Sequence, residues 1–290
     1  MATANFFWAF SPISLHDEIC IESFVKNEFE VNLYTYDPNI KIDGVNIVDA
    51  NEIIKVGEVN KYNFSGYKSS PYSGLSNEFR YLLMSKNKGW WFDTDILCLK
   101  NAKFFDDLDK KNERFIAGFE KNNDVNVAVL KINEKKIIDD LLNQLKIKKK
   151  NLKWGELGPK LFTNTLQKHN LIYLSQPKNL FYSINYENFM LPFLSKKKLE
   201  TKKLLKDSYV CHLYNEIQKR HGIPKNILPP KNSFLFEKFK EVRPKIVEIQ
   251  DFCLSDDTME ILLKIKNTSS IKENFIHLIK GIKKNFINLI

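Results

Sequence analysis

Short apolar runs alternate with segments of helical spacing along the first two thirds of the chain, and this alternation constrains the fold more than any other feature. Strands separated by helices pair mainly in parallel, so the pattern predicts an α/β domain with a largely parallel sheet. The predicted strands are 5–10, 31–36, 45–48, 90–92, 115–118 and 126–132, and the predicted helices are 15–27, 75–86, 135–146 and 159–169.

The alternation weakens after residue 214, where a stretch with three prolines predicts an extended connection before helices at 233–243 and 271–290. We therefore expect one domain over residues 1–222 and a helical C-terminal extension over residues 223–290. The last helix has apolar residues at helical spacing and lysines mostly on its other faces. Such a basic amphipathic helix either lies in an anionic membrane interface or packs on its own domain, and the sequence favours the two about equally.

The positive charge of the chain comes almost entirely from lysine. The 290 residues include 45 Lys and Arg against 35 Asp and Glu, a formal charge of +10, and only four of the basic residues are arginine. An excess of positive charge is typical of nucleic-acid-binding proteins, and such a protein is an alternative interpretation of this chain. No recognisable nucleic-acid-binding motif accompanies the charge, and arginine, which is favoured for reading bases, is scarce. We expect no nucleic-acid partner.

The cysteines and the apolar segments indicate the compartment. Four cysteines are spread along the chain without a Cys-x-x-Cys pair, a spacing that suits neither a zinc site nor a disulfide framework. The first residues lack the basic region and cleavage signal of a secretory peptide, and no run of about 18 apolar residues occurs. These features predict a protein of the reducing cytoplasm with scattered buried thiols.

The segment Asp93-Thr94-Asp95 carries the most chemical information, because two carboxylates directly follow the apolar strand 90–92. Residues i and i+2 of an extended chain point the same way, so both carboxylates could face one divalent cation beyond the strand end. Such a cation would stabilise a departing diphosphate. Asp-x-Asp alone also arises by chance in exposed turns. A glycoside hydrolase also uses two carboxylates and is a further alternative. Its carboxylates must stand about 5–10 Å apart across a sugar, whereas a pair at i and i+2 suits a metal better.

The context of this pair resembles a known enzyme superfamily. A helix with Ser76, Asn77 and Arg80 precedes Gly-Trp-Trp-Phe-Asp-Thr-Asp, as in the DXD-containing glycosyltransferases that include the alpha-1,4-glycosyltransferases, initiating mannosyltransferases and clostridial toxin glucosyltransferases. Collinear segments occur at 7–8, 33–36, 44–50, 125–129, 154–159 and 211–215, and the resemblance covers about residues 5–222. It implies a GT-A type, Rossmann-like mixed sheet flanked by helices, with residues 1–222 as the nucleotide-sugar-binding and catalytic domain.

The resemblance also implies roles for individual residues. Asp93 and Asp95 would bind Mn²⁺ or Mg²⁺, with Asp95 as a direct ligand and Asp93 bridging to ribose or metal. His212 would be a third metal ligand or a phosphate contact, and Arg80 would bond the donor sugar or phosphate. The catalytic set is therefore Asp93, Asp95 and Arg80, and the donor-binding set is Trp8, Asn77, Arg80, Asn126, Gly158 and His212.

Several of these positions keep a structural interpretation beside the functional one. Trp8 would stack on uracil, although core packing explains it nearly as well. Asn77 stands where many relatives have Asp, and Tyr214 replaces the usual Trp after the His-Leu pair. For Asn126 and Glu156, a turn or cap role is the stronger interpretation.

The function implied is the retaining transfer of a hexose or N-acetylhexosamine from a UDP-sugar to a glycan acceptor, with formation of an α-linkage. The abundance of Lys, Asn and Ile suits a low-GC bacterial genome. We therefore expect an acceptor in lipooligosaccharide, other lipopolysaccharide or capsule biosynthesis, and a peripheral position on the inner face of the cytoplasmic membrane through the C-terminal helix.

Overall fold

The computed structural model describes residues 2–10, 12–61, 72–121, 124–147, 156–246 and 252–264. A six-stranded sheet has the order β3-β2-β1-β4-β7-β6. Its strands pair in parallel from β3 to β4, whereas β7 runs antiparallel to both β4 and β6. The strands are β1 (Thr3–Phe7), β2 (Glu30–Thr35), β3 (Asn46–Asp49), β4 (Trp90–Phe92), β6 (Phe115–Phe119) and β7 (Val125–Ile132).

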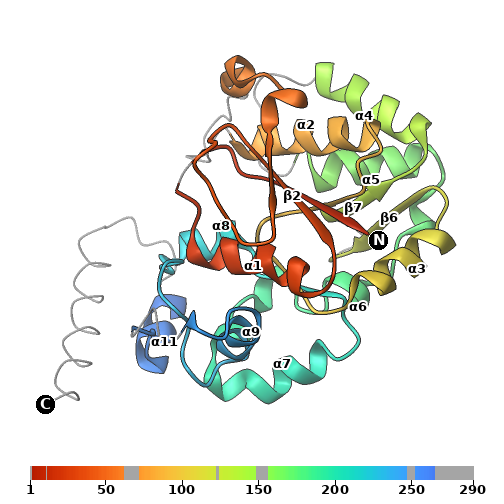
Figure 1. Ribbon diagram of the computed structural model, residues 1–290. Coiled ribbons are helices and arrows are strands. Elements are labelled where there is room, and N and C mark those ends of the chain that lie inside the picture. Colours follow the sequence, from red (N-terminus) through yellow and green to blue (C-terminus); the bar gives the residue numbers. More distant parts are fainter. Residues whose placement is uncertain are drawn as a thin grey trace, which may run out of the picture.

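Helices cover both faces of this sheet (Figure 1). One face packs against α1 (Leu15–Lys26) and α3 (Ala102–Lys111), and the other against α2 (Tyr72–Ser85), α4 (Lys135–Ile147) and α5 (Pro159–Lys168). Because both faces are buried, the central strands are largely apolar: β4 is apolar throughout, whereas β1 and β7 include Asn5 and Asn126. The mixed sheet flanked by helices is the fold class that the resemblance implied, and it replaces the largely parallel sheet expected from the alternation alone.

A second sheet consists of two three-residue strands, β5 (Ile96–Cys98) and β8 (Val210–His212), which pair antiparallel. The register sets Ile96 opposite His212. Neither strand was expected from the sequence, because each has only three residues and neither is bounded by a clear break such as Gly89 before β4. Their pairing is nevertheless what brings His212 beside the Asp-Thr-Asp segment.

Gly89 makes the start of β4 possible. Its φ angle is +101°, and an added Cβ would lie 2.7 Å from the carbonyl oxygen of Thr3 on β1. Only glycine combines that backbone conformation with such a close approach. The strand that ends at the two aspartates therefore begins at a position where a side chain would separate β4 from β1.

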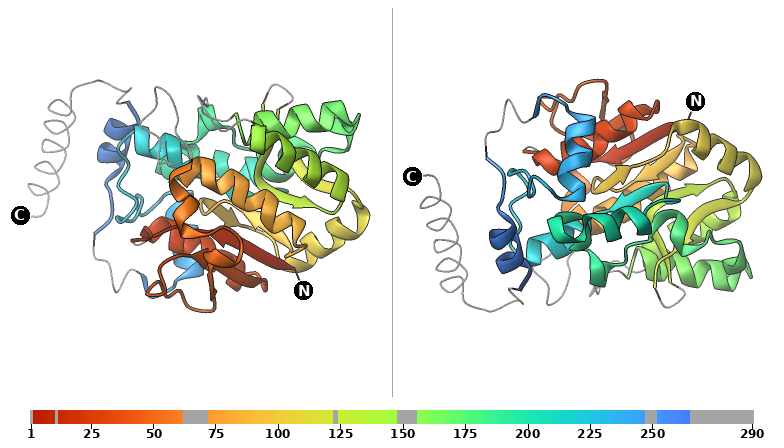
Figure 2. Two further views of the ribbon diagram at one scale, coloured as in Figure 1. Left: turned by 90° about the horizontal axis from the view of Figure 1, so that it is seen from above. Right: turned by 90° about the horizontal axis from the view of Figure 1, so that it is seen from below.

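The region after β8 packs on α1 through a third apolar cluster that also includes residues of β5 and β8. Figure 2 shows a C-terminal helix in lighter blue, α9 (Phe234–Val242), beside the red helix α1. The peptide N–H of His16 donates to the carbonyl oxygen of Lys225 at 3.1 Å, and Arg243 pairs with Glu18 and Glu22. The division at residue 222 stays a prediction, and the predicted helix 271–290 lies outside the described residues.

Shorter helices complete the described chain. The α-helices are α6 (Lys178–Phe181), α7 (Lys198–Leu204), α8 (Asn215–Arg220), α9 (Phe234–Val242) and α11 (Asp256–Lys264), and the 3-10 helices are Ala50–Glu52, Val56–Lys61, Ile172–Leu174, Tyr186–Asn188, Leu191–Phe193 and Ser195–Lys197. Among the helices described, none has the length and hydrophobicity to cross a membrane. All four cysteines are free thiols, three of them buried, as the sequence predicted.

Candidate active site

The Asp-Thr-Asp segment forms a tight turn between β4 and β5 at the carboxyl end of the main sheet. The peptide N–H of Ile96 donates to the carbonyl oxygen of Asp93 at 3.1 Å, which closes the turn. The peptide N–H of Asp93 donates to Ala128 on β7, and the carbonyl oxygen of Asp95 accepts from Leu213 after β8. The two carboxylates are therefore fixed by different strands. The sequence reasoning assumed that Asp93 and Asp95 are residues i and i+2 of an extended segment. In the structure they lie in a turn instead.

Arg80 reaches across from α2 and binds Asp93. Its Nη2 lies 3.0 Å from Oδ1 of Asp93, and its Nη1 donates to the carbonyl oxygen of Val127 at 2.7 Å. The indole of Trp91 donates to the same oxygen of Asp93 at 2.8 Å, and the guanidinium lies 5.0 Å from the Trp91 ring. Burial raises the pKa of Asp93, Arg80 opposes this rise, and the charge of Asp95 adds to it.

Asp95 has a separate set of partners. Its Oδ2 lies 3.4 Å from Nε2 of His212 and accepts a 2.6 Å hydrogen bond from the peptide N–H of Asn215. Burial by itself would raise the pKa of Asp95, but the charge and hydrogen bond of His212 and the N–H of Asn215 outweigh it, so the pKa is lowered. The surroundings of Asp95 therefore favour its anionic form, while Asp93 is paired with Arg80.

His212 lies in a buried aromatic setting. Its ring stacks on Tyr214 with centroids 3.9 Å apart, and the ring of Tyr182 lies 5.9 Å away. Burial would lower the pKa of His212, but Asp95 reverses the effect and the pKa is raised. Its Nδ1 is buried and has no hydrogen-bond partner among the described residues. A buried polar atom left in this state marks a position where a ligand could supply the missing interaction.

Tyr214 is held in an unusual backbone conformation beside this histidine. Its φ angle is +55°, in the left-handed region that bulky residues rarely adopt. Its hydroxyl donates to the carbonyl oxygen of Ile184 at 2.9 Å, so the strained residue is fixed at both backbone and side chain. Backbone strain of this kind concentrates at functional sites. The Tyr that replaces the expected Trp is therefore an ordered wall of the site.

Asn126 lies at the start of β7, and its side chain forms hydrogen bonds with Glu120, Ala128 and Tyr182. Its Nδ2 donates to Glu120 at 2.8 Å, and its Oδ1 accepts from the peptide N–H of Ala128 at 2.8 Å. The hydroxyl of Tyr182 is 3.3 Å from the same Oδ1. The side chain thus combines the cap-like role that the sequence allowed with a position next to the His212 cluster.

Asn77 and Gly158 lie against each other. An added Cβ on Gly158 would be 2.8 Å from Oδ1 of Asn77, so this glycine allows α2 and the start of α5 to approach closely. The hydroxyl of Tyr81 donates to the carbonyl oxygen of Leu157 at 3.3 Å and strengthens the same contact. Glu156 lies in the turn before α5, and Trp154 and Gly155 lie outside the described residues.

Asp17 is the residue that the sequence reasoning missed. Its side chain has no solvent exposure and accepts hydrogen bonds from Thr94 at 3.2 Å and from Nδ2 of Asn215 at 2.6 Å. It also forms an ion pair with Lys225 at 2.5 Å. In the sequence Asp17 is only the fourth residue of a Ser-x-x-Asp helix start, and it does form that cap with Ser14. Its contacts are with residues distant in the sequence, so no pattern in the residues around Asp17 indicates them.

Trp8 follows β1 at the same end of the sheet. The Nζ of Lys225 lies 5.7 Å from the centroid of its indole ring, and the indole N–H is buried without a partner among the described residues. Partial burial places Trp8 against the core face that includes Phe6 and Phe92. Both interpretations therefore remain: the ring packs on the core, and its edge offers a hydrogen-bond donor.

The donor set fits a divalent cation in part. No group of three or more His, Cys, Asp or Glu residues suited to a metal occurs in the described part of the chain. Asp95 and His212 lie together, whereas Asp93 is turned toward Arg80. Mg²⁺ in nucleotide enzymes is commonly bound through one or two carboxylates, substrate phosphates and water. Asp95, with Nε2 of His212 beside it, meets that smaller requirement.

The mixed sheet, flanked by helices and carrying these residues at its carboxyl end, is the GT-A type of architecture. Residues 132–228 match the sequence model of the alpha 1,4-glycosyltransferase conserved region. This match confirms the resemblance expected from the sequence and supports a glycosyltransferase function. The matched region includes Gly158, His212 and Tyr214, and it ends before α9.

Comparison of the fold with solved structures finds glycosyltransferases of low sequence identity. The galactosyltransferase LgtC in complex with donor and acceptor sugar analogs is 12% identical, with 83% of this chain and 94% of LgtC covered and a TM-score of 0.46. The PaToxG glycosyltransferase is 13% identical, with coverages of 83% and 87% and a TM-score of 0.41. The bifunctional enzyme WbbM is 10% identical, with 86% of this chain but 50% of WbbM covered and a TM-score of 0.45. Among curated proteins, none matches this chain in sequence.

Proposed function

We propose that the protein is a metal-dependent, retaining glycosyltransferase that moves a hexose or N-acetylhexosamine from a UDP-sugar to a glycan and forms an α-linkage. The observation that carries the proposal is the contact between Asp95 and His212, because it joins an anionic carboxylate to a buried imidazole at the carboxyl end of the sheet. Nucleotide ligands of open α/β sheets bind at this end.

The roles of the side chains follow from their charges and partners. Asp95 and His212 would hold Mn²⁺ or Mg²⁺, and Asp93 would bridge to ribose or metal. The cation supplies positive charge to the diphosphate of the donor. Arg80, fixed by Val127 and Asp93, would direct its guanidinium at the donor sugar or phosphate. Trp8 would stack on the uracil, while Asn77, Asn126 and Gly158 would border the sugar.

The transfer proposed is a front-face displacement. The bond between the anomeric carbon and the leaving phosphate oxygen breaks as the acceptor oxygen bonds to the same face of that carbon. The proton of the acceptor hydroxyl passes to the departing phosphate oxygen, so no protein carboxylate becomes covalently linked. Arg80 and His212 stabilise the charge that develops on the diphosphate.

The acceptor proposed is a lipooligosaccharide or capsule glycan of a bacterial cell, reached from the cytoplasmic side of the membrane. This rests on the Lys- and Ile-rich composition and on the basic amphipathic pattern of residues 271–290. Removal of residues 271–290 should reduce partitioning to anionic liposomes. Unchanged partitioning of the shortened chain would exclude this segment as the anchor.

A panel of UDP-sugars incubated with Mn²⁺ tests the central proposal, because slow donor hydrolysis is measurable without the acceptor. We expect release of UDP from one or a few sugars, and its loss on addition of EDTA. Thermal denaturation separates the proposal from its alternative. Stabilisation that requires both UDP and Mn²⁺ supports the transferase, whereas stabilisation by an oligonucleotide alone supports a nucleic-acid-binding protein.

A further inference from the structure

A lysine-rich surface lies on the side of the molecule formed by α7 and α9, at the lower edge of Figure 1. Residues 195–208 contain six lysines and two acidic residues, Glu200 and Asp207. Four of these lysines, at positions 196, 202, 203 and 206, are exposed. The segment therefore has a net charge of +4, which is a large share of the +10 of the whole chain.

A groove of about 290 Å³ borders this segment. Its lining includes Lys100, Lys202, Lys206 and Lys238, and Glu237 is the one acidic residue among the described residues that line it. Glu237 is already bound by two lysines, because Lys198 and Lys202 each approach one of its carboxylate oxygens to 2.5 Å. Its charge is thus neutralised within the protein. Lys238 pairs with Glu241 at 2.7 Å, so Lys100 and Lys206 are the ammonium groups of the groove that form no ion pair among the described residues.

Apolar side chains project beside the same charges. Leu199 is 81% exposed, Leu204 is 43% exposed and Phe104 is 49% exposed. The Nζ of Lys100 lies 5.8 Å from the centroid of the Phe104 ring and also donates to the carbonyl oxygen of Lys206 at 3.4 Å. Lys100 therefore connects the exposed phenyl ring with the rim of the groove.

We propose that α7 and the adjoining groove form a docking surface for the headgroups of an anionic phospholipid membrane. Clustered lysines are attracted to anionic headgroups, and exposed leucine and phenylalanine side chains enter the interface below them. The apolar residues favour a membrane over a nucleic acid, because exposed leucines can enter the acyl boundary but have no polar group to offer a phosphate. The surface, hereafter the α7 surface, does not include residues 271–290.

The α7 surface stands apart from the candidate active site but is rigidly connected to it. Asp95 directly precedes β5, whereas Lys100 follows that strand, so the short strand β5 separates the carboxylate from the groove. Docking through α7 would therefore hold the carboxyl end of the main sheet at a fixed position relative to the membrane. This inference does not depend on the glycosyltransferase proposal, because it requires only the charge and exposure of α7.

Sedimentation of the full chain with vesicles tests the proposal. The vesicles are pure phosphatidylcholine or an equal mixture of phosphatidylcholine and phosphatidylglycerol. We expect binding only to the mixture, and a fall in the partition coefficient of about tenfold or more when Lys203 and Lys206 are replaced together by Gln. Leu199→Ser should reduce it by about tenfold as well, through lost apolar contact.

The matched control replaces Lys135 and Lys136 on α4, which are equally exposed, by Gln. It removes the same charge from another face and should leave vesicle binding nearly unchanged. An equal loss in both double variants would overturn the α7 surface in favour of general electrostatic attraction. The proposal would also be wrong if the α7 variants bound vesicles as tightly as the parent chain does. It would be wrong as well if the variants kept vesicle binding and lost only the binding of a single-stranded oligonucleotide. The melting temperature of each variant shows whether it is folded, independently of activity.

Discussion

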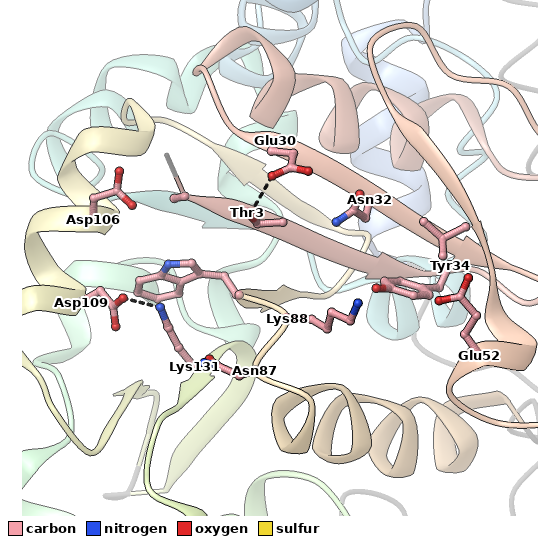
Figure 3. Close-up of a pocket in the computed structure, with 14 residues that line it drawn as sticks. Thr3, Glu30, Asn32, Tyr34, Glu52, Asn87, Lys88, Asp106, Asp109 and Lys131 are labelled. Carbon is pink, nitrogen blue, oxygen red and sulfur yellow. Dashed lines mark hydrogen bonds and ion pairs between the residues drawn. The ribbon is translucent and has the colours of Figure 1, made fainter.

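Both ends of the main sheet are polar, but they are built differently. At the carboxyl end, Asp17, Asp95 and Arg80 are almost completely buried and are bound by residues from distant parts of the chain. At the amino end lies a groove of about 600 Å³, lined by Thr3, Glu30 and other polar residues (Figure 3). The charged side chains that line this groove are exposed or half-buried, and none of them is fully buried.

The amino end is organised by amides rather than by charges. Asn46 donates to Asn32 at 3.2 Å, Asn32 donates to Asn5 at 3.1 Å, and Asn5 donates to the carbonyl oxygens of Lys88 and Trp90. This ladder crosses β3, β2 and β1 and ends on the backbone of β4. It satisfies polar groups on a face that α2 leaves uncovered. The comparison teaches that the two ends differ in buried charge, which is concentrated at the carboxyl end and is the feature expected of a catalytic site.

The largest effect is expected from Asp95→Asn, which keeps the shape of the side chain and removes its charge. Donor hydrolysis should fall by about a thousandfold, the upper range for loss of one preorganised electrostatic partner. UDP release with Mn²⁺ measures it. Asp106→Asn changes a carboxylate that lines the groove at the amino end and should leave the rate unchanged. Equal losses in the two variants would remove the distinction between the ends.

The next effect concerns stability at the carboxyl end. Asp17→Asn leaves the ammonium of Lys225 without its buried partner and weakens the bonds to Thr94 and Asn215. We expect the free energy of unfolding to fall by about 3 kcal/mol, the range for breaking one side of a buried ion pair. Urea denaturation measures it. Glu187→Gln removes the partner of Lys121 in an exposed pair and should cost at most about 0.5 kcal/mol.

A pH dependence should arise at the same end from His16. Burial lowers its pKa from 6.5 to about 4, although the bond to the carbonyl oxygen of Ile227 opposes the change. Because the unfolded chain binds a proton to this histidine more readily than the folded protein does, stability falls as the pH drops below 6.5. The loss from about pH 7 to about pH 5 should be about 2 kcal/mol. His16→Gln should flatten this part of the profile, and an unaltered slope would contradict the assignment.

The sequence predicted the strands of the main sheet well because each is an apolar run bounded by clear breaks. Trp90–Phe92 was predicted to the residue, and the other strand boundaries moved by a few positions at most. The reversal of β7 relative to β4 was not predictable from the alternation, since strand direction is set by tertiary packing. The resemblance supplied the mixed sheet that the pattern alone did not.

The candidate site was predictable only where a residue has a recognisable local context. Asp93, Asp95 and Arg80 come from a collinear motif, and in the structure Arg80 pairs with Asp93 whereas Asp95 contacts His212. Asp17 could not be found in this way, because its sequence context is that of an ordinary helix cap. The pairing of β5 with β8 was equally hidden, since two apolar tripeptides far apart in the chain carry no pairing signal.

The smallest effect is expected at the amino end, from Asn32→Ala. The substitution removes the middle of the amide ladder and leaves the Oδ1 of Asn5 and the Nδ2 of Asn46 without their partners. Asn5 is fully buried whereas Asn46 is exposed, so only one of the lost bonds should weigh on stability, by about 1 kcal/mol. Urea denaturation should show this shift while UDP release stays at the parent rate. If donor hydrolysis fell while the free energy of unfolding stayed unchanged, the groove at the amino end would take part in the reaction. The reaction would then not be confined to the carboxyl end of the sheet.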